Sequence, residues 1–95
     1  MVAEQAARRA LPVEAQRGLR QAFAGEVAAR LPHLRRPDDW ETVRRDAHTL
    51  ASSAWVVGEQ EISLLARALE DQLEQGAEPA GLAPLVAALE AVQAQ

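Results

Sequence analysis

One histidine stands in the middle of a stretch that suits an exposed helix carrying a nucleophile. The stretch runs from Arg44 to Gly58 and reads R-R-D-A-H-T-L-A-S-S-A-W-V-V-G, with His48 near its centre. At about 100° per residue, apolar residues spaced three and four apart form one stripe, and His48 points roughly 140° away from it. The imidazole is therefore predicted to face solvent, where its neutral form can act as a nucleophile toward a large partner. The stripe consists of Trp40, Val43, Ala47, Leu50, Ala54 and Val57.

A carboxylate further along the chain is placed to orient this imidazole. If the chain reverses near Gly58, His48 lies ten residues before the turn and Glu70 twelve residues after it. At about 1.5 Å rise per residue, the two side chains then lie at nearly the same height on adjacent antiparallel helices. Glu70 can accept a hydrogen bond from Nδ1–H of His48, which fixes the tautomer and leaves Nε2 free. The alternative is that Glu70 only pairs with Arg67, three residues before it.

Four helices are predicted to carry these residues. The first runs from Pro12 to Leu31, because proline suits a first helical turn and Pro32 disfavours helical geometry in the residue before it. A connector from His33 to Pro37 follows, in which His33 is expected to be solvated. The inward residues of the first helix recur every four positions and are Leu19, Phe23, Val27 and Leu31.

The second helix is predicted to begin at Asp38, where Asp38 and Glu41 have the spacing of a capping box. It carries Trp40 inward in its first turn, as part of the core with Phe23, and ends at Gly58, which readily takes the left-handed conformation that stops a helix. A third helix starts directly afterwards and a last one follows the A-E-P-A-G loop. Their inward residues are Ile62, Leu65, Ala66, Leu69 and Leu73, then Leu82, Leu85, Val86, Leu89 and Val92.

Short loops between four such helices predict an all-α fold, an antiparallel up-down four-helix bundle over residues 12–95. Residues 1–11 are expected to form an N-terminal extension or short helix. The chain has 95 residues, of which 21 are alanines and three are aromatic, so closely packed helices are favoured.

Composition also excludes several classes of function. All ten cations are arginines that lie among 14 acidic residues, and the net charge of -4 argues against a nucleic-acid partner. With no cysteine and two distant histidines, no metal site is expected. No apolar run approaches the roughly 18 residues of a membrane span, and the first ten residues lack the apolar core of a signal peptide. A cytoplasmic location is therefore expected.

The central half of the chain resembles the histidine phosphotransfer (HPt) domains of two-component signalling, including the P1 domain of chemotaxis kinases. The family pattern is a histidine, a leucine two on, a lysine three on, small residues four to six on, a glycine ten on, and a Leu-Glu pair on the next helix. The segments that carry the resemblance are A-H-T-L-A-S-S-A-W-V-V-G and L-L-A-R-A-L-E. The residues that match in register are His48, Leu50, Ser52, Ser53, Ala54, Gly58, Leu69 and Glu70.

The resemblance implies a phosphoprotein of a phosphorelay. His48 would accept a phosphoryl group from an aspartate of a response-regulator receiver domain, such as that of a hybrid sensor kinase, and pass it to another receiver. The receiver's aspartate and its bound Mg²⁺ would supply most of the catalytic power, and this chain would hold no cofactor. Small side chains at Ser52 and Ser53 would let the receiver approach closely, with Trp55 and Arg45 as further docking contacts.

One position departs from the family pattern. The family's lysine is Ala51 here, and its following glycine is Ser52. A cation near the histidine favours the neutral imidazole and then stabilises the phosphoryl charge, and Arg44 or Arg67 is predicted to supply it. Three functions stay open: a phosphorelay carrier without an ATP-binding kinase domain, a phosphorylation-silent HPt-like module that docks receivers, and a helical scaffold.

Overall fold

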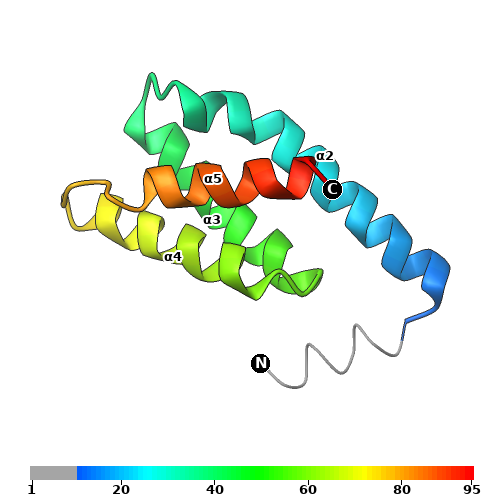
Figure 1. The fold of residues 1–95 in the computed structure, drawn as a ribbon. Helices are drawn as coiled ribbons and strands as arrows, with labels where there is room; N and C mark the ends of the chain where they lie inside the picture. The colour runs from blue at the N-terminus through cyan, green and yellow to red at the C-terminus, as the bar shows by residue number, and fades with distance from the viewer. Residues whose placement is uncertain (1–10) are drawn as a thin grey trace.

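Four helices make up most of the structure, a computed structural model that describes residues 11–95 (Figure 1). They are α2 (Val13–Arg35), α3 (Trp40–Val56), α4 (Gln60–Glu74) and α5 (Leu82–Gln93). Helix α3 packs against α2 and α4, and α5 packs against the same two helices, so the four close into a bundle. The described residues contain no strand, and the predicted all-α four-helix bundle is confirmed. The predicted extension over residues 1–11 lies outside the described residues except for Leu11.

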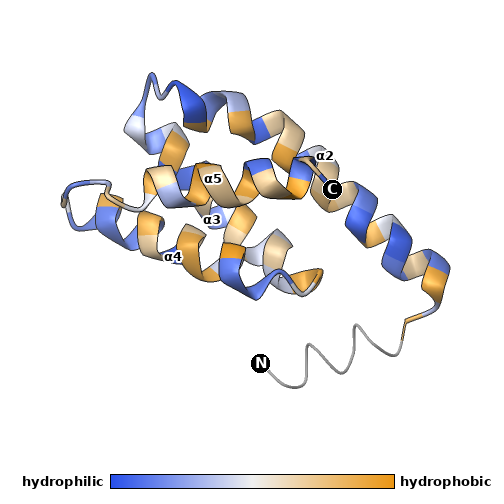
Figure 2. Cartoon of the chain, in the orientation of Figure 1, coloured by the Kyte–Doolittle hydropathy of each residue, from blue (hydrophilic) through white to orange (hydrophobic). Residues whose placement is uncertain are grey.

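Apolar side chains from all four helices fill the centre of the bundle. Figure 2 shows hydrophobic residues along most of α5 and a more hydrophilic first half of α2, which extends past the other helices. Phe23, predicted to be a core residue, is 3% exposed. The prediction for Trp40 is wrong, because it is the first residue of α3, lies at the end of the bundle and is 47% exposed. The most deeply buried apolar residues are Val27, Leu31, Leu34, Val43, Ala47, Leu50, Ala54, Ala66, Leu69, Leu85 and Leu89.

Helix α2 continues past Pro32, so the predicted end at Leu31 is wrong. Pro32 lies in the last turn, where its missing N–H leaves one backbone carbonyl without a helical partner. Leu34 in the same turn is 1% exposed, and burial of such a side chain contributes about 1.5–3 kcal/mol. The N–H of Arg36 donates to the carbonyl of Pro32 at 3.3 Å and completes the turn. Packing of this turn on the core therefore outweighs the local preference of proline, and His33 belongs to α2.

Helix α3 is capped by Asp39, so the predicted cap at Asp38 is wrong by one residue. Oδ2 of Asp39 accepts from the hydroxyl of Thr42 at 2.9 Å, and Oδ1 accepts from the N–H of Glu41 at 3.1 Å. These two bonds hold the pKa of Asp39 below its usual range, the Thr42 bond contributing most. The side chain of Glu41, predicted to reach back toward the cap, bonds Arg44 instead.

The turn between α3 and α4 is tight, and Gly58 makes it possible. Its φ of 84° lies in the left-handed region, which glycine adopts without a steric penalty. The N–H of Gly58 donates to the carbonyl of Trp55 at 3.1 Å, and the N–H of Glu59 donates to that of Ala54 at 2.8 Å. This pair of bonds is the Schellman pattern of a helix end. The predicted role of Gly58 in stopping the second helix is confirmed.

Candidate functional site

The side chain of His48 projects from the middle of α3 and is 67% exposed. Its Nδ1 atom lies 2.7 Å from Oε2 of Glu70 on α4, so the contact expected from the sequence spacing is present. A carboxylate only accepts hydrogen bonds, and Nδ1 of the neutral imidazole therefore carries the proton. Nε2 then keeps its lone pair and is the nitrogen available to a partner. The carboxylate of Glu70 is only 14% exposed and is held against the bundle.

Close packing of α3 on α4 brings the two side chains together. Ala51 on α3 is 4% exposed and Ser63 on α4 is fully buried, so small side chains line this contact below the site. The hydroxyl of Ser63 donates to the carbonyl of Ala51 at 2.7 Å and joins the helices directly. Sequence reasoning missed Ser63, although its position two turns before Glu70 places it on the same face of α4.

Arg44 joins the site from one turn earlier on α3. Its guanidinium bonds Glu41 through Nε at 2.8 Å and through Nη2 at 2.6 Å, a fork on one carboxylate. Its Nη1 lies 3.6 Å from Oε2 of Glu70, the oxygen that also meets His48, and 3.7 Å from Glu74. The hydrogen bond from Arg44 lowers the pKa of Glu41 and raises the pKa of Arg44 itself. Both side chains therefore stay charged near neutral pH.

The model of the Hpt domain family matches residues 4–95, nearly the whole chain. The chain belongs to the Hpt domain family. Hpt domains act in histidine phosphotransfer within phosphorelays and interact with receiver domains. No curated protein and no solved structure matches the chain.

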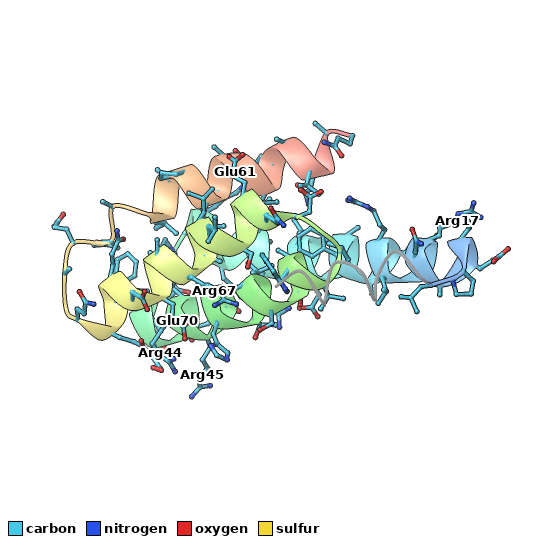
Figure 3. The ribbon with its side chains drawn as sticks, turned by 90° about the horizontal axis from the view of Figure 1, so that it is seen from below. Arg17, Arg44, Arg45, Glu61, Arg67 and Glu70 are labelled. Carbon is cyan, nitrogen blue, oxygen red and sulfur yellow. The ribbon has the colours of Figure 1, made fainter. Side chains whose placement is uncertain are left out.

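Two further arginines of this Hpt domain lie on the same side of α3 and α4 as Glu70 (Figure 3). Figure 3 shows Arg44 and Arg45 from α3 gathered with Arg67 and Glu70 from α4 on one side of the helix pair. Within residues 11–95, Arg45 and Arg67 form no ion pair, and both are exposed. Glu70 meets Arg44 and His48 rather than Arg67, so the alternative pairing expected from the sequence is not formed.

The predicted docking residues lie on two sides of α3. Ser52 is exposed one turn after His48, and Trp55 is half-buried near the end of the helix. Ser53 instead borders a hollow of about 220 Å³ between α2 and α3, beside Phe23. Contact of Ser52, Ser53, Trp55 or Arg45 with a receiver stays a prediction.

Asp46 lies on the side of α3 that packs against α2, away from His48 and Glu70. It is 9% exposed, its Oδ1 lies 3.5 Å from Nε of Arg30, and its Oδ2 lies 3.4 Å from Nδ1 of His33. The carboxylate that the sequence places next to the arginines of the site therefore points away from them. His33, expected to be solvated, is 60% exposed but borders this cluster.

The described residues of this Hpt domain offer neither a metal-binding cluster nor a membrane-spanning helix. The described part of the chain has no group of three His, Cys, Asp or Glu side chains arranged to hold a metal ion. Over residues 11–95, no helix combines the length and the hydropathy that a bilayer crossing needs.

Proposed function

We propose that His48 is the phosphoacceptor of this Hpt domain and that Glu70 orients its imidazole. The observation that carries the proposal is the 2.7 Å contact of Nδ1 with Glu70 on an imidazole that is 67% exposed. This arrangement leaves Nε2 unprotonated and directed away from the bundle, as a nucleophile for a large partner requires.

The proposed step transfers a phosphoryl group from a receiver aspartate to His48. The Nε2 lone pair attacks phosphorus and forms an N–P bond, while the P–O bond to the aspartate breaks and the aspartate carboxylate leaves with the electron pair. The imidazole then carries a positive charge, which the carboxylate of Glu70 stabilises through Nδ1–H. Attack by the aspartate of a second receiver reverses these changes and completes the relay. The receiver is proposed to bring its own Mg²⁺, which would neutralise phosphoryl oxygens.

The proposed docking surface surrounds the imidazole. Ser52 offers a small side chain one turn from His48, where a receiver can come close. Trp55 offers an aromatic contact, and Arg45 and Arg67 offer guanidinium groups that are not used within the described residues. In the family, a lysine would supply a positive charge to the phosphoryl group. We assign this task to Arg67, because Arg44 is already shared by three carboxylates.

Incubation with a phosphorylated receiver tests the proposal. Phosphate that is acid-labile and base-stable should appear on the wild-type domain and be absent from His48→Gln, with the helical content of both unchanged. His33→Gln serves as the matched control. His33 lies on α2 beside Asp46, away from Glu70, and its replacement should not affect labelling. Label that persists on His48→Gln would remove this residue from the relay.

A second candidate function is a module that docks receivers without accepting phosphate. The observation that favours it is Ala51, which is 4% exposed and gives the site no cation where the family has a lysine. Binding of a receiver by a wild-type domain that takes no label from it would favour this second function.

A further inference from the structure

Arg44 occupies an unusual place among the charges of the site. It forks onto Glu41 on its own helix with two short contacts, and the remaining nitrogen, Nη1, reaches across to α4. There it lies 3.6 Å from the single oxygen of Glu70 that also faces His48 at 2.7 Å. Glu41, Arg44, Glu70 and His48 thus form one continuous chain of polar contacts between the two helices.

We infer that Arg44 is a positioning residue for Glu70: it fixes the carboxylate oxygen that meets Nδ1 of His48. The inference rests on the proposed role of His48. It assigns Arg44 to the carboxylate that orients the imidazole, whereas Arg67, which forms no ion pair within residues 11–95, is left to meet the phosphoryl group.

The other charged side chains near this pair do not hold Glu70. Among the described residues, Arg45 and Arg67 form no ion pair with its carboxylate. Glu74 lies 3.7 Å from Nη1 of Arg44, and Asp46 is turned toward Arg30 on α2. Arg44 is therefore the cation that the structure places at the oxygen facing His48.

The fork onto Glu41 explains why Arg44 can hold a fixed position while partly exposed. A side chain with 30% exposure and one weak contact would sample many rotamers. Two short contacts to one carboxylate restrict the guanidinium and leave Nη1 directed at α4. A lysine at this position could keep the charge but could not bridge Glu41 and Glu70 in this way.

Nitrogen-15 NMR of the imidazoles in Arg44→Gln tests the inference without any phosphate. In the wild type, the neutral His48 should be almost entirely the Nδ1–H tautomer. In Arg44→Gln, a mixture of the two neutral tautomers is expected. His33 serves as the internal reference and should not change.

Phosphotransfer adds a second readout. Arg44→Gln should lower the rate at pH 7 by about three- to tenfold, because Nε2 of His48 is then unprotonated in a smaller share of the molecules. Arg44→Lys keeps the charge but cannot bridge Glu41 and Glu70, so it should give a mixture of tautomers too. Glu74→Gln, which removes the other acidic partner of Nη1, should leave both readouts at wild-type values.

The outcomes separate the inference from the proposed function. An unchanged His48 tautomer in a folded Arg44→Gln domain would overturn the inference, and so would an equal change in Glu74→Gln. A wild-type domain that takes no phosphate while the NMR changes appear as expected would count against the proposed function and leave the role of Arg44 in place.

Discussion

The carboxylate of Glu70 has two tasks at different stages of the proposed reaction. Before transfer it would select the tautomer of His48 through the 2.7 Å contact, and after transfer it would face the charged phosphoimidazole. A neutral group in its place could perform the first task but only weakly the second, since charge-assisted bonds are stronger.

Replacement of Glu70 should therefore slow phosphotransfer, and the size of the effect should depend on the residue that replaces it. We expect Glu70→Ala to reduce the rate by at least about tenfold, equivalent to about 1.4 kcal/mol of barrier, and Glu70→Gln to reduce it less. Single-turnover transfer from a phosphorylated receiver measures both. Glu74→Ala, one turn further along α4, is the control, and a full rate in Glu70→Ala would show that the imidazole orients itself.

Some side-chain contacts of the site could be predicted from the sequence, and others could not. The contact of His48 with Glu70 could be predicted because it depends only on helix rise and on the turn at Gly58. The choice of Arg44 rather than Arg67 as the cation near Glu70 could not, because both arginines lie within reach and side-chain rotamers decide between them. Ser63 was missed because a serine on a helix is usually assigned to the solvated face.

The α3–α4 turn is the element on which the site depends most. Gly58 has φ 84°, a conformation that costs a β-branched residue about 1–3 kcal/mol. Gly58→Val should lower the free energy of unfolding by about that amount, measured by urea denaturation. Gly25→Ala on α2 is the matched control: its added Cβ meets nothing within 4 Å, and the change should stabilise the helix by about 0.5–1 kcal/mol. An unaltered midpoint in Gly58→Val would mean that the turn can take another form.

The start of α3 gives a prediction about acid stability. The folded-state pKa of Asp39 is lowered, mainly by the Thr42 hydroxyl and then by the Glu41 N–H. Its contribution to stability is therefore complete above the unfolded pKa and is lost as the pH falls through the lower folded value. Asp39→Ala should lower the melting temperature at pH 7, and this difference should shrink below about pH 4. Asp38→Ala should leave the melting temperature unchanged at both pH values, and a loss equal to that of Asp39→Ala would assign the cap to Asp38.

Helix identities were predictable because four apolar stripes at 3.6-residue spacing leave few alternatives. Helix ends were not, since they depend on contacts between distant parts of the chain. The last turn of α2 survives Pro32 because Leu34 is buried in the core. Helix α3 is capped by Asp39 rather than Asp38 because the side chain of Thr42 donates a second hydrogen bond to Asp39.

At the scale of the whole molecule, the four helices divide their tasks. Every residue proposed to take part in transfer lies on α3 or α4, whereas α2 and α5 supply buried residues such as Leu31 and Leu89. The site therefore faces outward from one helix pair, where a receiver can reach it without disturbing the core.

Docking of the receiver gives a prediction at this scale. Trp55→Ala should weaken binding of a receiver, measured by titration calorimetry, with little change in the melting temperature of this half-buried position. Trp40→Ala is the matched control, because this tryptophan is 47% exposed at the other end of α3. Equal binding by the Trp55 and wild-type domains would remove Trp55 from the docking surface.

Because the turn at Gly58 is short, the geometry of the site depends on the number of residues between His48 and Glu70. His48 and Glu70 meet because a fixed number of residues separates them, and one residue inserted within α4 before Glu70 would rotate that carboxylate by about 100° and shift it by about 1.5 Å. The histidine of such a chain would no longer face Glu70. Residues 40–74 thus form a hairpin in which the number of residues between His48 and Glu70 decides whether the two side chains meet.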